Sequence, residues 1–465
     1  MATILQKPLF SWEDLDRSSD LCRLQLVLQY LPDDAIVRAL EAERGRGRDT
    51  YPVGPVWNAM LAGIVLQHPT VESLLRELRR NAELRQVCGF NPVLGTDAVP
   101  SSFAMSRFLA NVIEHADLVD AMFEELVDSL AELVPDLGQH LGFDGKAIPS
   151  FSTGRKNRET GETTDPDAEW GVKTYRGVDA EGRPWQKLTR WFGYQLHLIC
   201  DTTLEIPVAF EVMPASASEV TRLLPMVDEL AMRHPEIVER CSELSADRGL
   251  DSAGVNKALW KDYEIKPVID TRRLWKDEKN EQGFDASREI TRALNPAAAD
   301  TIVYTERGQL RCVCPLTGEE RRMAFWGFEA DRDTLHYRCP AAAYGLVCQG
   351  RAECERGALG HETSFGRVVR VPLDLDYRIF TPTPRDTPSW KHAYASRTAV
   401  ERVNARVDQV FGFERHTIRG LAKMRVRVGL ALAVMLALAV GSICEKKPEL
   451  IRSLVNKPRA QGKAA

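Results

Sequence analysis

The sequence lacks the features that mark an exported or membrane-spanning protein. Its first twenty residues, MATILQKPLFSWEDLDRSSD, have no basic start followed by an apolar run, so we expect no signal peptide. The longest uncharged apolar segment, 428–444 (VGLALAVMLALAVGSIC), is shorter than the roughly 20 residues that cross a bilayer and is rich in Ala and Gly. We therefore predict a helix buried in a large core, a protein without a membrane partner and a cytoplasmic location.

Standard zinc-binding spacings, in which two to four residues separate paired cysteines, are also missing. Five of the ten cysteines nevertheless fall within 272–375. Two interpretations stay open for them: ligands of a structural zinc ion, or free thiols in a small β-rich module. The potential ligands are Cys312, Cys314, Cys339, Cys348, Cys354 and His361.

The chain has no overall positive charge, since its formal net charge is −5. Residues 1–150 carry 13 Lys and Arg against 22 Asp and Glu, a net of −9, whereas 391–465 carry 15 against 5, a net of +10. Such asymmetry can present a local basic surface to a polyanion, and phosphate binding needs only a local patch. The acidic total therefore does not exclude a nucleic-acid partner.

What is present is an ordinary globular composition over 465 residues, with 44% hydrophobic and 27% charged residues. Apolar residues recur every three or four positions from about 20 to 135, which predicts helices, with an N-cap at Ser101. Strand-like and helical runs then alternate, as in a mixed α/β sheet. The predicted units are a helical N-terminal domain (1–138), a first core part (139–271), an inserted β-rich cysteine-bearing module (272–375), a second core part (376–445) and a basic tail (446–465).

Within the core, the patterns predict individual elements. Residues 152–177 show no hydrophobic pattern and are predicted as a loop. Residues 389–412 (SWKHAYASRTAVERVNARVDQVFG) read as one helix. The predicted strands are 141–148, 191–201, 205–214, 243–247, 266–270 and 377–382, and the predicted helices between them are 216–234 and 252–262.

Two aspartates stand in or at the end of predicted strands. Asp144 lies within LGFDGKAI, and Asp247 closes ELSAD. Burying an unpaired carboxylate costs several kcal/mol, so each needs a cation, donors or water. Either one alone could simply be hydrated at a strand end or cap the next helix.

A third carboxylate belongs to the segment YASRTAVERVNARV at 394–407. On a helix, Tyr394, Arg397 and Glu401 lie at i, i+3 and i+7 and share a face, although an ordinary solvated Arg–Glu pair has the same spacing. If Asp144, Asp247 and Glu401 converge, their mutual repulsion calls for hard divalent ions. A pair of such ions suits phosphodiester hydrolysis and strand transfer.

Several motifs occur in an order that carries a family resemblance: TTDPDAEWGVK (163–173), GYQLHLICD (193–201), IPVAFEVMPASASE (206–219), SADRGLDS (245–252), the Tyr394–Arg397–Glu401 helix and, more loosely, SFAMSRF (102–108). In this order they resemble bacterial insertion-sequence transposases with a DDE triad on an RNase H-like core. The resemblance covers about 140–270 and 375–445.

The resemblance implies an RNase H-like mixed sheet flanked by helices. It implies that Asp144, Asp247 and Glu401 are catalytic and bind two Mg²⁺ (or Mn²⁺) ions, and that Tyr394 and Arg397 contact the DNA end. It further implies a nucleoid-associated homodimer on double-stranded DNA, which binds terminal inverted repeats with its N-terminal domain, cleaves the element ends and joins them to target DNA.

Some positions depart from the family pattern. The lysine often found seven residues after the glutamate is replaced by Asp408, which leaves Arg406 or Arg415 as the nearest bases, and a lysine of the Gly-Tyr strand is replaced by Gln195. His197 is expected either near the metals or as a satisfied histidine of the sheet.

Other basic residues fit two interpretations each. Arg419 and Lys423 share a face of the segment 416–428, either against DNA phosphates or in solvent. Arg155, Lys156 and Arg158 are predicted to lie in a mobile loop that orders on DNA. Two other functions also stay open: a catalytically inactive or recruited DNA-binding protein derived from a transposase, and another RNase H-like nuclease.

Overall fold

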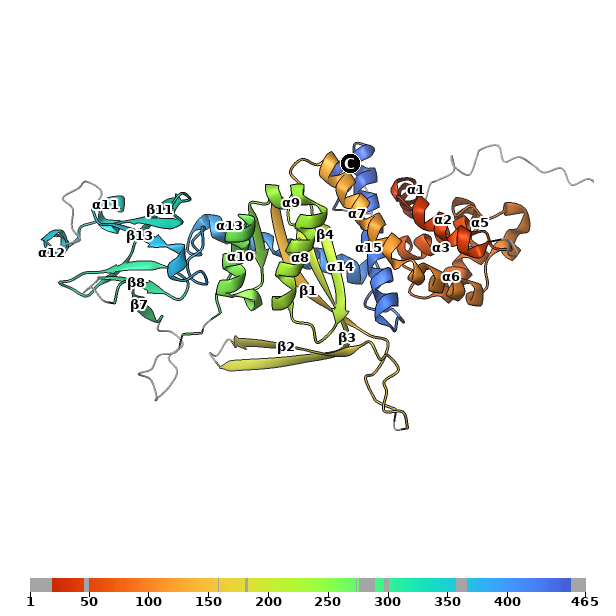
Figure 1. The fold of residues 1–465 in the computed structure, drawn as a ribbon, viewed down its shortest axis with the longest axis horizontal. Coiled ribbons are helices and arrows are strands. Elements are labelled where there is room, and N and C mark those ends of the chain that lie inside the picture. The colour runs from red at the N-terminus through yellow and green to blue at the C-terminus, as the bar shows by residue number, and fades with distance from the viewer. Residues whose placement is uncertain are drawn as a thin grey trace, which may run out of the picture.

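The computed structural model describes residues 19–45, 50–157, 159–179, 183–272, 274–275, 289–296, 301–356 and 366–452. A central sheet separates a group of helices at one end of an elongated molecule from two small sheets at the other (Figure 1). This arrangement confirms the predicted fold class, a mixed α/β sheet flanked by helices, with a helical N-terminal part and a β-rich insertion. The residue limits of the predicted units stay predictions.

The N-terminal part is helical because its apolar stripes meet in one core and several of its helix starts are capped by side chains. The Thr70 hydroxyl accepts from the Ser73 amide (3.1 Å), and the predicted N-cap Ser101 accepts from Ala104 (3.2 Å). Trp57 is fully buried, with its indole N–H bonded to Asp33 (2.6 Å). The elements are α1 (Ser19–Tyr30), α2 (Asp34–Arg44), α3 (Val53–Val65), α4 (Val71–Arg80), α5 (Ala82–Val87), η1 (Pro92–Ala98), α6 (Ser102–Glu114) and α7 (Ala116–Leu133).

The central sheet has the order β2-β3-β1-β5-β6, and β4 pairs with β3. The β1–β5 and β5–β6 pairs are parallel, whereas β3 pairs antiparallel with β1, β2 and β4. The strands are β1 (His140–Pro149), β2 (Glu169–Val178), β3 (Pro184–Asp201), β4 (Ile206–Pro214), β5 (Glu243–Ala246) and β6 (Lys266–Ile269), and the helices among them are α8 (Glu219–Arg233), α9 (Pro235–Arg240), η2 (Arg248–Leu250) and α10 (Ala253–Tyr263).

One predicted loop was wrong, because part of 152–177 forms β2. This strand pairs with the first half of β3 in a hairpin arm that extends below the sheet (Figure 1). The Trp191 ring covers Gly171 on the neighbouring strand, since a Cβ there would lie 2.3 Å from it, and Trp185 covers Gly177 in the same way. Such cross-strand aromatic–glycine pairs stabilise a strand that shows no regular alternation.

The insertion forms two small sheets, ordered β10-β9-β8-β7 and β11-β12-β13. These sheets share a small separate hydrophobic core that includes Tyr337 and Phe380. Its elements are β7 (Thr291–Ala293), β8 (Ile302–Thr305), β9 (Leu310–Val313), β10 (Glu320–Arg322), β11 (Ala324–Glu329), β12 (Thr334–Arg338), α11 (Pro340–Tyr344), α12 (Arg351–Arg356), β13 (Val368–Pro372) and η3 (Leu373–Leu375).

The chain returns from the insertion through a turn rather than through the strand predicted at 377–382, which was wrong. The Asp376 side chain accepts from the Arg378 amide (2.9 Å) and folds the backbone back. Arg385, which is 1% exposed, donates to the carbonyls of Ile269 (2.8 Å), Ile379 (2.7 Å) and Arg378 (2.9 Å). These bonds fasten the returning segment to the end of β6.

Three helices and a 3₁₀ turn complete the described chain: α13 (Pro388–Ser396), α14 (Thr398–Gln409), α15 (Leu421–Cys444) and η4 (Pro448–Leu450). The helix α15 is long and apolar enough to cross a membrane, with a mean hydropathy of 2.2, but 89% of that apolar window is buried inside the protein. It packs against α7, α1 and β4 (Figure 1). This agrees with the prediction of a buried core helix. Residues 453–465 of the predicted tail and His361 lie outside the described residues.

Candidate active site

The first two predicted carboxylates lie on neighbouring parallel strands. In the β1–β5 ladder Phe143 is opposite Ala246, so Asp144 and Asp247 follow at the next position of each strand. Asp144 is still within β1, whereas Asp247 begins the turn into η2. Parallel pairing therefore brings together two residues that are 103 positions apart in the sequence.

The helix α14 carries the third carboxylate and packs directly on β1. A Cβ at Gly142 would lie 2.6 Å from the Val400 side chain, so the glycine permits the close approach of this helix. One turn further, the Asn404 amide donates to Asp144 Oδ2 (3.0 Å). Glu401 precedes Asn404 by three residues and so lies beside this buried face of the helix, with its own side chain paired with Arg397.

The predicted single helix at 389–412 is two helices that meet at Arg397. The Arg397 amide bonds to the Tyr394 carbonyl (3.2 Å), and the Val400 amide to the Arg397 carbonyl (3.0 Å), which is the tighter 3₁₀ pattern. The backbone of Arg397 stays right-handed helical, so Tyr394 and Glu401 remain on neighbouring turns.

Arg397 holds this cluster together. It donates to Glu401 Oε1 (2.8 Å), and its guanidinium lies 5.8 Å from the centre of the Tyr394 ring, which stacks on Trp390 at 4.7 Å. Burial alone would lower the pKa of Arg397, but Glu401, Tyr394 and Asp247 outweigh it and raise that pKa. The electrostatic influence of Asp247 on Arg397 joins this cluster to the strand ends.

Burial raises the pKa of the Asp144 carboxyl to about 6. Lys173 and Arg397 act in the opposite direction, and Glu219 adds to the increase. A carboxylate so placed is stabilised in its charged form by any further cation. Glu401 differs, because its side chain is 51% exposed and turns toward Arg397.

Two further residues near Asp144 were not predicted from the sequence. Lys173, on β2, donates to the Gly145 carbonyl (2.9 Å) and pairs with Glu219 at the start of α8 (2.6 Å). Gln195 donates to the same Glu219 oxygen (2.7 Å). Both Lys173 and Glu219 end motifs that carried the family resemblance, which was the available signal.

His197 lies on the other face of the sheet from Asp144. In the β1–β3 ladder it is opposite Gly145, whereas Asp144 is opposite Leu198, so the two side chains point in opposite directions. His197 is fully buried and stacks on Phe143, and neither ring nitrogen has a hydrogen-bond partner among the described residues. His197 is thus not beside the carboxylates. It is also not a histidine whose ring nitrogens are hydrogen-bonded within the described residues, which was the other expectation.

Asp408, at the position of the family's lysine, forms an ion pair with Lys146 of β1. Lys146 follows Asp144 by two residues and therefore points to the same face. Arg406 is engaged elsewhere, with the Glu205 carbonyl (2.9 Å) and carboxylate. Lys146 is thus the basic residue of this neighbourhood that lies on the same face of the sheet as Asp144. Arg415 is exposed in the turn that follows α14.

The other predicted DNA-binding residues lie around α15. Arg419 is exposed, donates to the Phe151 carbonyl (2.7 Å) and stacks over that ring. Lys423 is half-buried in the first turns of α15. The loop residues Arg155 and Lys156 are exposed, and Arg158 lies outside the described residues.

Among the described residues, one group of three acidic, histidine or cysteine side chains has all its ligand atoms within 4.8 Å of one another: Asp128, His234 and Glu236. Neither the three predicted carboxylates nor any three of the insertion's cysteines lie that close together among the described residues. Both ring nitrogens of His234 are already bonded, to Asp128 (2.7 Å) and Glu124 (2.5 Å). Burial alone would lower the pKa of His234, but these carboxylates raise it. This group is therefore better explained as a buried histidine held by two more exposed carboxylates than as a metal centre.

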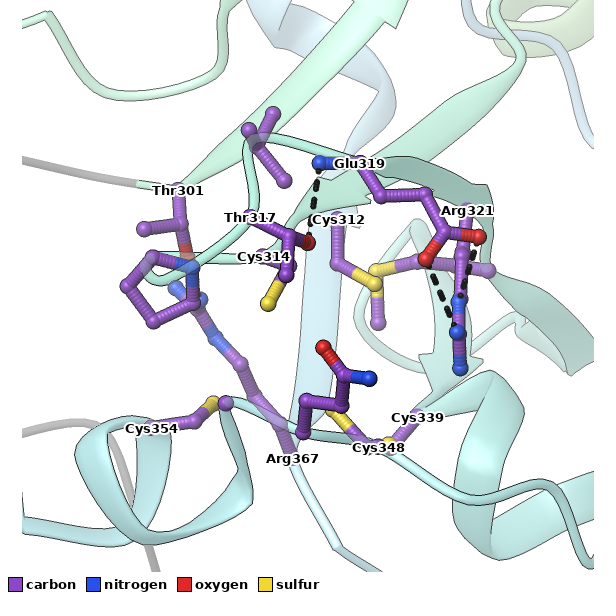
Figure 2. A pocket seen from close by; sticks show the side chains of 15 residues that line it. Thr301, Cys312, Cys314, Thr317, Glu319, Arg321, Cys339, Cys348, Cys354 and Arg367 are labelled. Carbon is purple, nitrogen blue, oxygen red and sulfur yellow. Dashed lines mark hydrogen bonds and ion pairs between the residues drawn. The ribbon is translucent and has the colours of Figure 1, made fainter.

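The five cysteines of the insertion surround one pocket (Figure 2).

The family of this chain follows from its similarity to known proteins. A model described as "Transposase DDE domain" matches residues 141–437, which is more than half of the chain. A search of curated proteins finds no match.

Proposed function

Because this chain belongs to the transposase DDE domain family, we propose that it is the DNA transposase of an insertion sequence. In this proposal it binds the terminal inverted repeats of the element, cleaves phosphodiester bonds at the ends and transfers the freed 3′ ends to target DNA. Asp144, Asp247 and Glu401 are the proposed catalytic residues.

The observation that supports this proposal most is the meeting of three elements at Asp144. The β1–β5 register sets Asp144 beside Asp247, and the Asn404–Asp144 hydrogen bond docks the helix of Glu401 onto the same strand. The raised pKa of Asp144 fits a carboxyl group whose negative charge is balanced by bound cations.

The donor set fits hard divalent ions, because it consists of carboxylate oxygens without thiols. Asp144, Asp247 and Glu401 would hold two Mg²⁺ or Mn²⁺ ions, which would activate the attacking oxygen and stabilise the leaving oxygen of the phosphodiester. Glu401 would exchange its bond to Arg397 for this role, which frees the guanidinium for a DNA phosphate.

Tyr394 and Arg397 are proposed to contact the DNA end, since both lie near enough to Asp247 for its charge to influence their pKa values. Arg406 is proposed to act by orienting α14 through Glu205 rather than by touching phosphate. Arg419 and Lys423 would contact flanking DNA. Two ends must be brought together, so a homodimer on DNA is the proposed working form.

The test is cleavage of DNA that carries the sequences flanking the gene, with Mg²⁺. Asp247→Asn should abolish cleavage while it leaves binding to the same DNA largely intact, because the substitution removes a charge and almost no volume. Asp262→Asn, at an exposed position on α10, is the matched control and should cleave normally. Equal cleavage by the Asp247→Asn and wild-type proteins would contradict the proposal.

Binding of the ends by a wild-type protein that never cleaves them would instead favour a recruited, inactive DNA-binding protein. Cleavage of DNA without regard to the flanking repeats would favour another RNase H-like nuclease.

A further inference from the structure

The β2–β3 arm is a two-stranded ribbon over most of its length. Residues 169–178 of β2 pair with 184–193 of β3, and among the described strands β3 gains β1 and β4 as partners only from Gly193 and Tyr194 onward. Figure 1 shows the arm extending below the central sheet. A ribbon of this kind can present its faces to another molecule.

One face of the arm carries exposed apolar side chains. Val172 and Arg190 are directly opposite each other in the ladder, and Trp170 and Leu188 lie two positions away on their own strands, so all four share this face. Trp170, Val172 and Leu188 are 53%, 54% and 45% exposed. We call these four residues the arm platform. Exposed apolar side chains that gather on one face are typical of an interaction site.

The arm is basic although the chain as a whole is acidic. Its paired segments 172–178 and 184–190 contain four lysines or arginines and no aspartate or glutamate, whereas the net charge of the chain is −5. Lys187 and Arg190 are exposed and have no ion-pair partner among the described residues. Uncompensated positive charge beside exposed apolar and aromatic side chains is the composition of a surface that contacts nucleic acid.

The arm platform lies on the same face of the sheet as Asp144. Side chains alternate along β3, and Leu198, which is opposite Asp144, therefore shares its face with Arg190. At the base of the arm, Lys173 donates to the carbonyl of Gly145, the residue after Asp144 (2.9 Å). Arg190 precedes Leu198 by eight residues, so the strand separates the two by at most about 27 Å.

A loop joins the arm platform to the start of α15. A Cβ at Gly154 would lie 2.9 Å from the Trp170 ring, so this glycine lets the loop pack on the platform. Arg419, just before α15, donates to the carbonyl of Phe151 in the same loop (2.7 Å). Basic residues thus continue from α15 to the arm; the exposed ones in the loop are Arg155 and Lys156.

We propose that the arm platform binds double-stranded DNA beside the phosphodiester that is cleaved at Asp144, an inference that rests on the function proposed above. Arg190 would contact a phosphate, and the apolar side chains would lie in the groove, where thymine methyl groups offer apolar contacts. The major groove admits a two-stranded ribbon. Since B-DNA rises about 3.4 Å per base pair, Arg190 would reach no more than about eight base pairs from the cleaved phosphate.

DNA suits the arm platform better than a second copy of this chain does. Two platforms facing each other would bring Arg190 of both copies together, and like charges across an interface oppose binding. A polyanion instead supplies the charge that the arm lacks.

The test measures binding of the full-length protein by fluorescence anisotropy, on duplexes that carry the sequences flanking the gene and on random-sequence duplexes of equal length. Leu188→Ser combined with Arg190→Ala should weaken binding to both about 10-fold, because phosphate and groove contacts of this kind do not depend on sequence. Leu375→Ser combined with Arg332→Ala is the matched control and should bind like wild type. Leu375 is 46% exposed, close to Leu188, and Arg332 is exposed in the insertion.

A second measurement locates the contact and does not depend on loss of binding. A photo-crosslinking p-benzoylphenylalanine in place of Leu188 should crosslink to the flanking duplex within about eight base pairs of the cleaved phosphate. The same group in place of Leu375 should give no crosslink. Urea unfolding of each variant verifies that it folds as stably as wild type.

Wild-type affinity in the arm variant, or crosslinks as frequent at position 375 as at 188, contradicts the arm site. Weaker binding to single-stranded DNA alone contradicts the choice of duplex. Loss of self-association with unchanged DNA affinity would assign the platform to a second copy instead.

These outcomes differ from failure of the proposed function. A protein that never prefers or cleaves the flanking DNA, but binds random duplexes less well when the arm is changed, keeps the arm site and loses the transposase function. Normal cleavage of the flanking DNA with no effect of the arm does the reverse, and wild-type protein that binds no duplex contradicts both.

Discussion

At the scale of single residues, Asn404 connects the glutamate helix to the first aspartate. Its amide nitrogen donates to Asp144, and its amide oxygen is buried without a partner among the described residues. A neighbour that orients a ligand in this way usually affects metal affinity or activity by about 10- to 100-fold. Asn404 is thus a positioning residue for Asp144.

We predict that Asn404→Leu lowers Mg²⁺-dependent cleavage by about 10- to 100-fold and raises the Mg²⁺ concentration needed for half-maximal rate. The measurement is a Mg²⁺ titration of cleavage on end-bearing DNA. Asn256→Leu would be a poor comparison because Asn256 bonds to the Tyr377 carbonyl; Gln409→Leu, exposed at the end of α14, is the control. An unchanged Mg²⁺ dependence would show that Asn404 only packs.

His197 determines a pH dependence of stability. Burial lowers its pKa to about 4, with Arg222 and Lys173 contributing, from an ordinary value of 6.5. The unfolded state therefore takes up a proton first as the pH falls. The free energy of unfolding therefore keeps its full value with respect to His197 above about pH 6.5. It falls by up to about 3 kcal/mol as the pH drops toward 4.

We predict that His197→Phe, which keeps the stacking on Phe143, makes the free energy of unfolding less dependent on pH between about 6.5 and 4. Urea unfolding at several pH values measures this. A His392→Gln variant, at an exposed position, should keep the wild-type dependence of unfolding free energy on pH. The prediction is contradicted if His197→Phe keeps that dependence as well.

At the scale of elements, the ion pair between Lys146 of β1 and Asp408 of α14 fixes how the glutamate helix lies on the sheet. The two side chains are 12% and 25% exposed. Removing either partner leaves a charge in a half-buried place without its counterion, which costs more than removing both. In this chain the lysine stands on the strand β1, whereas the family pattern often has a lysine on the glutamate helix, at the position of Asp408.

We predict that Lys146→Met and Asp408→Asn each lower the free energy of unfolding. The double variant should lose about 1 kcal/mol less than the sum of the two single losses. A double-mutant cycle of urea unfolding measures this coupling. Additive effects would mean that the pair does not contribute to docking α14.

At the scale of the whole molecule, charge is unevenly distributed although the total is −5. The described part of this basic region contains the glutamate helix and the start of α15, so some of its positive charge lies near the candidate active site. The acidic N-terminal part is mainly helical, and its last helix, α7, packs against α15, where Asp120 pairs with Arg425. DNA binding should therefore depend on local phosphate contacts near α14 and α15.

We predict that Arg419→Ala and Lys423→Ala each reduce the slope of log affinity against log salt by about 1 and weaken binding to all DNA sequences alike. Fluorescence anisotropy across a salt series measures the slope. Arg332→Ala, an exposed position in the insertion, should leave it unchanged. A slope that moves in neither variant would place these residues away from DNA.

The sequence by itself determined most elements and predicted the three candidate carboxylates. Periodicity is a local property, so strands such as 141–148 and 243–247 and the buried helix at 428–444 could be predicted from neighbouring residues. The two aspartates were found because charged groups are rarely placed in apolar strands, and Glu401 by its helical spacing from Tyr394 and Arg397. The family's motif order supplied the grouping of Asp144, Asp247 and Glu401.

Only the tertiary structure decided which residues meet. The β1–β5 register, the Asn404–Asp144 bond and the Lys146–Asp408 pair join residues more than 100 positions apart. The β2–β3 arm escaped prediction because its stability comes from cross-strand pairs rather than from alternation along one strand. The cysteine pocket likewise depends on how α11 and α12 return the chain, and no spacing along the sequence records that.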